Sequence, residues 1–384
     1  TNGTMKIGIS VLTAGRNAGG PETYEVELVR NLARLDRKNQ YYVYCTDEFA
    51  VRAIGVQQEN FCYRLLRPSS RWLSVSLSLP VLMLKDQVEL LHATFAPPLF
   101  LFKPLVYTVH CVSSIVHPEF YPNGVRWRLN RLLRMGIAKA KHIISVSAST
   151  QRHLQELFQV PKDRITIVYN GVRSIFTPVP PQEALQSLAG RLKIRDPYFL
   201  YVGKLETRKN VKRILQAYAR YRKVSGRQER LVLVGRRSAS FPEIDEMILA
   251  LGIKDQVVLP GYVPSNDLPL LYSAAKMFVF PSCWEGFGIP ILEAMACGAP
   301  VLTSNRTSMP EIAGDAAFLV DPESVEEIAE GMAHVASSTS LRSKLIERGF
   351  ERAKAFTWDD CARQTLEVYR KVGADGSENT RLNQ

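Results

Sequence analysis

The sequence predicts an α/β protein made of two domains in tandem, each built on a doubly wound parallel sheet. Its 384 residues exceed the usual size of one domain. Short runs rich in Val, Ile and Leu alternate with helical stretches, as in parallel sheets that are buried on both faces. This alternation stops once, at a proline-containing segment after residue 176, and then begins again. No window of 18 consecutive apolar residues predicts a membrane-spanning helix.

The first domain is expected over residues 5–178. It opens with an apolar strand at 5–12, a loop that contains glycines, and a helix at 22–36. That helix carries Leu28, Leu32 and Leu35 on one face. A basic helix is expected at 125–141. The other apolar runs predict strands at 41–45, 88–94, 104–110, 142–148 and 165–171.

Residues 179–196 are predicted to be a linker, because prolines lie near both ends of this region and strand-forming residues are few. The second domain is expected over 197–355. Its strands are predicted at 198–204, 230–235, 257–263, 277–282, 299–304 and 316–322, with helices at 209–224, 242–251, 266–275 and 289–297. An amphipathic helix, residues 356–373, follows, with Thr357 or Asp359 as its candidate N-cap. Ligands of such sheets bind at the carboxyl ends of strands, so the cleft between the two domains is the expected site.

The positive charge of the chain is concentrated in its first half. The formal net charge is +12. Residues 1–196 hold 25 Lys and Arg against 14 Asp and Glu, a net of +11, and the remainder hold 24 against 23, a net of +1. This asymmetry indicates an anionic partner, such as a membrane surface, a phosphorylated acceptor or nucleic acid. A solvated surface without a partner is the alternative. No nucleic-acid-binding motif accompanies the charge, so no nucleic acid partner is expected.

The six cysteines form no CxxC pair and no cluster with zinc-ligand spacing. In a chain of this length they predict reduced thiols, a cytoplasmic protein and no metal site. This pattern therefore favours chemistry carried by other side chains.

The segment "YVGKLETRKNVKRILQAY" (201–218) is a candidate diphosphate site. A strand ends at Gly203, and the cations Lys204, Arg208 and Lys209 precede an amphipathic helix. The N-terminus of a helix itself attracts anions. The sequence therefore predicts that this loop binds a diphosphate, and the alternative is a solvated basic turn.

Two further features lie at strand ends in the first domain. Gly19 and Gly20 precede Pro21 at the start of a helix, and bare glycines let a ligand approach the backbone. This is neither a GxGxxG motif nor a P-loop, so by itself it is a weak signal. His110 ends a buried strand, where ligands are bound in such sheets, although a lone histidine is more often structural.

The segment "CWEGFGIPILEAMACGAP" (283–300) places Glu285 in a Gly-rich turn and Glu293 in the helix that follows. Carboxylates accept hydrogen bonds from hydroxyl groups, so the pair is expected to hold two polyol parts of one ligand. The alternative is a pair of glutamates favoured by the helix dipole. That alternative explains Glu293 poorly, because its neighbours on the helix face are apolar.

From these residues the chain resembles the retaining glycosyltransferases of family 4, the glycosyl transferases group 1, which have the GT-B fold. "EGFGIPILEAMACGAPV" is similar to the E-x7-E motif of that family, and "VGKLETRKN" is similar to its phosphate-binding loop. "HIISVSASTQRHL", "VYNGV", "GYVP", "DLPLLYSAAKMFVFPS" and "SNRTSMPEIAGDAAFLVDP" follow in the family's usual order. The resemblance runs from about Met5 to Arg370.

The resemblance implies transfer of a hexose of the mannose or glucose type, with retention of configuration, from a GDP-, UDP- or ADP-sugar. The acceptor would be a glycan or lipid-linked glycan in polysaccharide biosynthesis. No metal and no other cofactor are implied, and the sequence has no DxD triplet. The first domain would bind the acceptor, the second the nucleotide-sugar, and helix 356–373 would cross back to the first. A sugar-nucleotide epimerase with the same fold and a nucleic-acid-binding protein are the rival hypotheses.

The resemblance also implies roles for individual residues. The catalytic set would be Glu285 on the donor sugar, Lys209 and Arg208 on the diphosphate, and His110 near the donor sugar. Lys204 stands where many family members have Arg, which keeps the charge and loses the bidentate geometry. Glu293 would bind the ribose. The remaining donor-binding positions would be Gly19, Gly20, Gly203, Tyr262, Val263, Phe287, Gly288 and Ile289.

The acceptor side is defined only by surface chemistry. The basic amphipathic stretch 126–141 and the apolar stretch 71–84 suit a peripheral enzyme at the inner face of a membrane. The alternative is an ordinary helix with a basic outer face.

Overall fold

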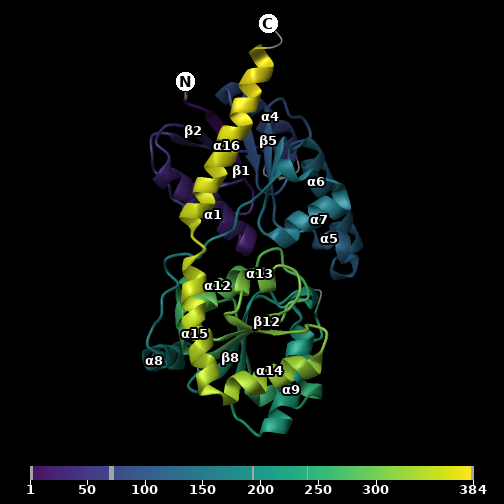
Figure 1. The fold of residues 1–384 in the computed structure, drawn as a ribbon, viewed down its shortest axis with the longest axis vertical. Helices are drawn as coiled ribbons and strands as arrows, with labels where there is room; N and C mark the ends of the chain where they lie inside the picture. Colours follow the sequence, from purple (N-terminus) through teal and green to yellow (C-terminus); the bar gives the residue numbers. More distant parts are fainter. Residues whose placement is uncertain (1–2, 69–72, 193, 240, 382–384) are drawn as a thin grey trace. The chain divides into compact units, whose positions relative to one another are not determined.

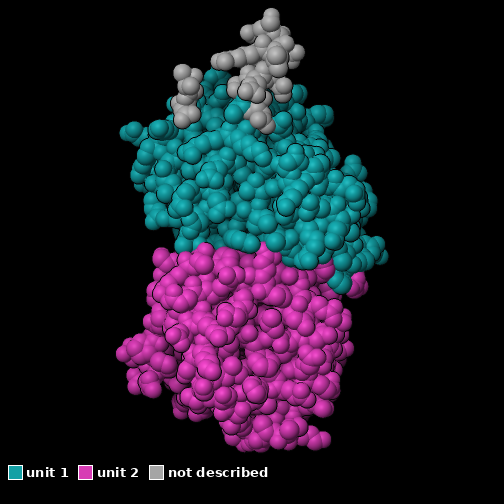
Figure 2. Space-filling model, viewed as in Figure 1, with its two compact units in different colours: residues 1–118, 122–171, 357–384 teal, residues 119–121, 172–356 magenta. Residues whose placement is uncertain are grey.

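The computed structural model describes residues 3–68, 73–192, 194–239 and 241–381. They form two compact units (Figures 1 and 2). Unit 1 comprises residues 1–118, 122–171 and 357–384, and unit 2 comprises 119–121 and 172–356. Each unit holds one sheet in which every strand pair is parallel. The predicted fold class, two doubly wound parallel sheets, is therefore confirmed.

The sheet of unit 1 has the strand order β3-β2-β1-β4-β5-β6-β7. Its interior strands are continuous apolar runs with little or no exposure, which is why the sequence marked them so clearly. The strands are β1 Lys6–Val11, β2 Gln40–Cys45, β3 Phe61–Leu65, β4 Leu90–Ala93, β5 Leu105–Val109, β6 His142–Ser145 and β7 Ile165–Ile167.

The helices of unit 1 include the C-terminal one, α16, which packs on α1 (Figure 1). They are α1 Gly20–Leu35, α2 Glu48–Ile54, a π-helical turn Ser74–Ser78, α4 Leu79–Asp86, α5 Ser113–Val116, α6 Asn123–Lys139, α7 Ala148–Phe158 and α16 Trp358–Arg381. Two 3-10 turns, Pro118–Phe120 and Lys162–Arg164, accompany them.

The sheet of unit 2 has the order β10-β9-β8-β11-β12-β13. Its strands are β8 Tyr198–Val202, β9 Arg230–Val234, β10 Val257–Gly261, β11 Ala275–Phe280, β12 Val301–Ser304 and β13 Ala317–Val320. Its helices are α8 Pro181–Leu192, α9 Val211–Ser225, α10 Ile244–Ala250, α11 Leu268–Ala274, α12 Ile289–Ala296, α13 Met309–Ala313, α14 Val325–Ser337 and α15 Thr339–Lys354. The 3-10 turns are Thr207–Lys209, Lys254–Gln256 and Ser265–Asp267.

Three details differ from the sequence-based predictions. Strand β3 was not predicted, because it is a short edge strand with half-buried polar positions. Residues 179–196 are not a plain linker, since they contain α8, which packs against α11 within unit 2. The division between the units falls after Gly171, whereas the prediction placed it after residue 178. Of the apolar stretch 71–84, residues 71–72 lie outside the described residues.

In both sheets the strand order reverses beside the first strand of the unit. In unit 1 this switch point lies between β1 and β4, and in unit 2 between β8 and β11. Doubly wound sheets bind ligands outside the carboxyl ends of the strands at such points. Among the described residues, no helix is both long and apolar enough to cross a membrane.

Candidate functional site

The loop after β8 is formed by two glycines that let backbones pack closely. Gly203 has φ of 155° and Gly235, after β9, has φ of 146°. A Cβ on Gly235 would lie 1.8 Å from the carbonyl oxygen of Gly203, so no larger residue fits there. Tyr201 Oη donates to the carbonyl of Lys204 at 2.9 Å. The end of β8 is thereby fixed immediately before the cationic turn.

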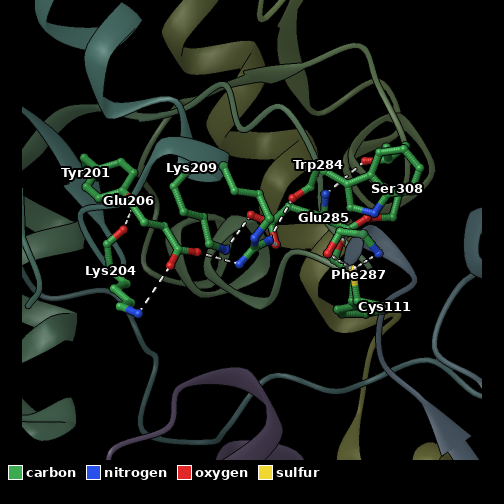
Figure 3. A network of polar contacts seen from close by, with 12 residues as sticks. Cys111, Tyr201, Lys204, Glu206, Lys209, Trp284, Glu285, Phe287 and Ser308 are labelled. Carbon is green, nitrogen blue, oxygen red and sulfur yellow. Dashed lines mark hydrogen bonds and ion pairs between the residues drawn. The ribbon is translucent and has the colours of Figure 1, made fainter. Parts of the chain in front are cut away.

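The three cations of this turn are compensated by two carboxylates (Figure 3). Arg208 Nη2 lies 2.8 Å from Glu206 Oε1, and Lys204 Nζ lies 3.5 Å from Glu206 Oε2. Lys209 Nζ lies 2.5 Å from Glu285 Oε1, and Arg208 Nη1 lies 3.5 Å from Glu285 Oε2. Three positive and two negative side chains leave the cluster one net positive charge, which suits an anionic ligand.

Burial and pairing act in opposite directions on the central pair. Burial raises the pKa of Glu285, but the nearby charges of Lys209 and Arg208 outweigh it and hold the pKa below its usual value. Burial lowers the pKa of Lys209, against the attraction of Glu285. Because Glu285 remains ionised, it is an acceptor for hydroxyl groups and a counter-charge for Lys209.

The turn that carries Glu285 is anchored from the segment between β12 and α13. Thr307 Oγ1 accepts a hydrogen bond from the backbone N–H of Glu285 at 3.2 Å. Ser308 Oγ lies 3.1 Å from the carbonyl oxygen of Glu285 and 2.9 Å from that of Phe287, and donates to this pair of acceptors (Figure 3). Asn210, in the left-handed region, donates to the carbonyls of Pro281 and Pro322. These contacts fix the carboxylate beside the cationic turn.

Glu293 lies on the buried face of α12 and is not part of the cationic cluster. Tyr272 Oη donates to its Oε2 at 3.2 Å, and Arg173 Nη2 lies 3.7 Å from its Oε1. Burial raises the pKa of Glu293, and Arg173 and Tyr272 only partly oppose that. The two glutamates of the motif therefore have pKa values displaced in opposite directions. Sequence reasoning found Glu293 and missed both of its partners.

The remaining donor-binding candidates of unit 2 lie at strand ends and at the start of α12. Tyr262 follows β10 and is 48% exposed, with the guanidinium of Arg236 5.0 Å above its ring. Val263 is buried. Gly288 has φ of 102° at the start of α12, between the buried Phe287 and Ile289. An exposed ring stacked under a cation is a suitable surface for a planar, electron-rich base.

In unit 1, Gly19 and Gly20 begin α1 after the loop that follows β1. Gly19 has φ of 74° and ψ of −134°, and an added Cβ would meet nothing within 4 Å. The position therefore has open space beside it and a backbone conformation that L-residues rarely adopt. Gly15, in the same loop, also has positive φ, and a Cβ there would lie 2.7 Å from the backbone of Phe49.

Two glutamates of α1 hold this loop, and neither was identified from the sequence. The buried Glu25 accepts from the backbone N–H groups of Leu12, Thr13 and Ala14 at 3.1, 2.7 and 2.9 Å. Its oxygens also accept from the hydroxyls of Thr13 and Thr94. Glu22 accepts from the N–H groups of Gly15 and Ala18 at 2.8 and 2.6 Å. A helical glutamate in an amphipathic pattern ordinarily faces solvent, so only the folded loop reveals these contacts.

His110 follows β5, beside the ring of Tyr24 at a centroid distance of 4.8 Å. Burial lowers its pKa to about 4, against a hydrogen bond with the backbone of Thr94. Its Nε2 is buried and makes no hydrogen bond to any described residue. The ring is therefore neutral near pH 7 and has one nitrogen available to a ligand.

Within unit 2 the structure brings four of the predicted site residues together: Lys204, Arg208, Lys209 and Glu285. Within unit 1, His110 and the Gly19 loop each follow the end of a strand. Glu293 lies in a separate buried contact. Glu206, which neutralises part of the cationic turn, was overlooked because a single glutamate between cations has no distinguishing pattern. His, Cys, Asp and Glu side chains of the described residues form no group of three able to hold a metal.

Residues 18–174 match the family described as Glycosyltransferase Family 4, and residues 189–352 match Glycosyl transferases group 1. The chain is 36% identical to O-antigen chain mannosyltransferase B of Escherichia coli, over 69% of this chain and 70% of that protein. It is 29% identical to the serotype-specific mannosyltransferase WbdA of Escherichia coli, over 70% of this chain and 33% of that longer protein.

Solved structures give the same fold. Sucrose-phosphate synthase from Thermosynechococcus elongatus superposes with a TM-score of 0.78 at 20% identity, over 97% of this chain and 100% of that one. Anabaena HepE, solved with UDP and glucose, gives a TM-score of 0.74 at 19% identity, over 96% and 100%. The two parallel sheets and these superpositions show the GT-B fold. The chain belongs to glycosyltransferase family 4, the glycosyl transferases group 1.

Proposed function

We propose that this chain is a retaining hexosyltransferase that moves a mannose or glucose-type sugar from a nucleotide-diphosphate sugar to a glycan or lipid-linked glycan. The observation that carries the proposal is the cluster of Lys209, Arg208 and Glu285 at the carboxyl ends of β8 and β11. The similarity to an O-antigen mannosyltransferase supports mannose as the first sugar to test. The UDP and glucose bound to Anabaena HepE support a nucleotide-sugar donor.

In the proposed reaction the bond between the sugar and the diphosphate breaks, and negative charge develops on the leaving phosphate. Lys209 and Arg208 stabilise that charge, and Lys204 adds to it from a more exposed position. One such contact is typically worth about 2.7–4 kcal/mol in a preorganised site. The acceptor hydroxyl attacks from the same face and passes its proton to the leaving phosphate oxygen. The configuration is then retained without a nucleophilic carboxylate, and the proposal assigns the charge stabilisation to these cations rather than to a metal.

The other candidates have binding roles in this proposal. Glu285 accepts from donor-sugar hydroxyls, with the amides of Phe287 and Gly288 beside it. Glu293 binds the ribose, and Tyr262 stacks near the base. In unit 1 the backbone of Gly19 and Gly20 contacts the ligand, because no side chain lies in between. His110 accepts a hydrogen bond from a sugar hydroxyl at Nε2, which has no partner among the described residues.

The donor is tested by a thermal-shift panel of GDP-mannose, UDP-glucose and ADP-glucose. A nucleotide-sugar that binds the folded chain at 100 times its dissociation constant should stabilise it by about 2.7 kcal/mol. The enzyme should then transfer that sugar to an acceptor glycan with the anomeric configuration of the donor, which the NMR signal of the product's anomeric proton reports. Transfer should continue when EDTA removes metal ions. A chain that none of these nucleotides stabilises contradicts the proposal.

We also propose that unit 1 of this enzyme binds peripherally to a membrane surface. Five large apolar side chains in the segments 77–84 and 100–102 of unit 1 are 57–66% exposed: Leu77, Val81, Leu84, Phe100 and Phe102. Leu84, Phe100 and Phe102 line the same small cavity. Leu77 and Val81 precede Leu84 at helical spacing, on the same face of the π-helical turn and α4, so we treat the five as one apolar surface. Lys139 of the basic helix α6 donates to the carbonyls of Pro98 and Leu99, so basic residues adjoin this surface. An apolar patch bordered by cations suits an anionic bilayer surface.

Replacing Val81 and Phe102 by serine should weaken binding to vesicles that contain anionic lipid by about tenfold or more, since burying each side chain is worth about 1.5–3 kcal/mol. A flotation assay measures this. Phe49 and Val224 are as exposed and lie elsewhere, so replacing that pair by serine makes the same change in composition and serves as the control. Equal flotation of the two variants would remove the membrane contact from the proposal.

A further inference from the structure

A cavity of about 700 Å³ lies between α5 and α6 in unit 1, outside the site described above. The side chains from α6 that line it are Arg126, Trp127, Asn130, Arg131 and Arg134. Their spacing places them on one face of the helix. The opposite face of α6 packs on the sheet, where Gly136 meets the ring of Tyr107 so closely that a Cβ would lie 2.3 Å from it. This close contact fixes the distance between α6, which forms one wall of the cavity, and the sheet.

The three arginines of this wall differ from most surface arginines of the chain. Arg64, Arg191 and Arg306 pair with carboxylates. Arg131 and Arg134 lie instead over aromatic rings, those of Trp127 and Phe158, at 5.3 and 5.4 Å. Within the described part of the chain, no carboxylate forms an ion pair with any of the three cavity arginines. A guanidinium group over an aromatic ring keeps its positive charge and its N–H donors, because a ring is no counter-charge.

The cavity also has an unsatisfied acceptor and apolar walls. Asn130 Oδ1 is buried and receives no hydrogen bond from any described residue. Ile115, Pro118 and the 64%-exposed Trp127 supply apolar surface. A ligand that fits must be anionic for the arginines, carry a hydroxyl for Asn130, and have an apolar portion for Trp127.

We propose that this cavity binds the diphosphate group of the acceptor, with the first sugar hydroxyls at Asn130 and the first carbons of an alkyl chain at Trp127. This inference rests on the proposed function, because it assigns the acceptor class of that same enzyme. Planar guanidinium groups bind phosphate oxygens in bidentate fashion, which separates a diphosphate from a neutral glycan. The three arginines of the site are part of the excess positive charge of the first half of the chain.

The experiment is isothermal titration of inorganic pyrophosphate and of decyl diphosphate into the full chain saturated with a nucleoside diphosphate, so that the donor site is filled. The variant is Arg131→Gln with Arg134→Gln. The control is Arg37→Gln with Lys38→Gln, which removes two exposed charges from unit 1 at another place. The dissociation constant of both probes should rise by about tenfold or more in the variant, as expected for loss of charged hydrogen bonds. It should be unchanged in the control.

Comparing the two probes separates the contribution of the diphosphate from that of the alkyl chain. Tighter binding of decyl diphosphate than of pyrophosphate, lost on Trp127→Ala, supports an alkyl-linked source, and equal binding supports the diphosphate alone. Wild-type protein that binds neither probe, or a variant that binds both as well as the control, overturns the proposal. Binding of the nucleoside diphosphate is measured in a separate titration of the ligand-free chain. Its absence would count against the proposed function and leave the pyrophosphate result intact.

Discussion

Replacing Lys209 by alanine should lower turnover by about 10²–10³-fold, the usual cost of losing one preorganised contact to developing charge. Lys209 is half-buried and lies at the turn before α9, and its Nζ lies 2.5 Å from Glu285 Oε1. Arg208 shares this role, but Glu206 and the carbonyl of Trp284 already hold its guanidinium, so it replaces Lys209 only in part. The measurement is sugar transfer at saturating donor and acceptor.

The same substitution leaves Glu285 with a weaker partner, so loss of stability must be separated from loss of chemistry. Breaking a buried ion pair by removing one member costs about 3–5 kcal/mol. Lys276 offers a matched control, since it forms a similarly buried pair with Glu229 in unit 2 and lies on β11. Lys276→Ala should lose comparable stability in chemical denaturation and keep its turnover per folded molecule. Lys209→Ala with turnover near that of Lys276→Ala would remove Lys209 from the catalytic set.

The fold was predictable because its information is local. Each interior strand is an apolar run, and the helices that were predicted follow a periodic pattern, so the pattern along the chain was enough for the fold class. Helices such as α7, α14 and α15 were not predicted. Strand β3 was missed because it is an edge strand that carries Arg64, and an edge strand needs fewer apolar residues than an interior one. Helix α8 was missed because prolines near a helix start were taken as signs of a linker, although proline suits the first turn of a helix.

The site was predictable only in part, because charge compensation is not local. Lys209 and Glu285 are 76 positions apart, and only the adjacency of β8 and β11 brings them together. The family resemblance supplied both residues and could not say that they would pair. Arg173 and Tyr272 around Glu293 were missed for the same reason, since neither lies in the motif that marks the glutamate.

The glutamates of α1 show the same limit and lead to the second large effect. Glu25→Gln should destabilise the chain by about 2–5 kcal/mol, since at least two buried donors lose their acceptor. Glu25 Oε2 accepts from two backbone N–H groups, Thr13 and Ala14, and Oε1 accepts from a third, that of Leu12. The amide nitrogen of glutamine must take one of these places and face donors that cannot rotate away. Urea denaturation measures the loss.

Glu27→Gln is the control on the same helix, because Glu27 pairs only with Arg30 within the helix, and a pair of that kind is worth about 0.5 kcal/mol. A purely structural role for Glu25 would lower the fraction of folded enzyme and nothing else. If Glu25 positions the Gly19 loop for the reaction, folded Glu25→Gln loses turnover and keeps most of its affinity for nucleoside diphosphate, because all of the proposed donor contacts except Gly19, Gly20 and His110 belong to unit 2. Glu25→Asp, which keeps both oxygens, should recover part of the stability. Folded Glu25→Gln enzyme with wild-type turnover would reduce Glu25 to a stabilising residue of the loop.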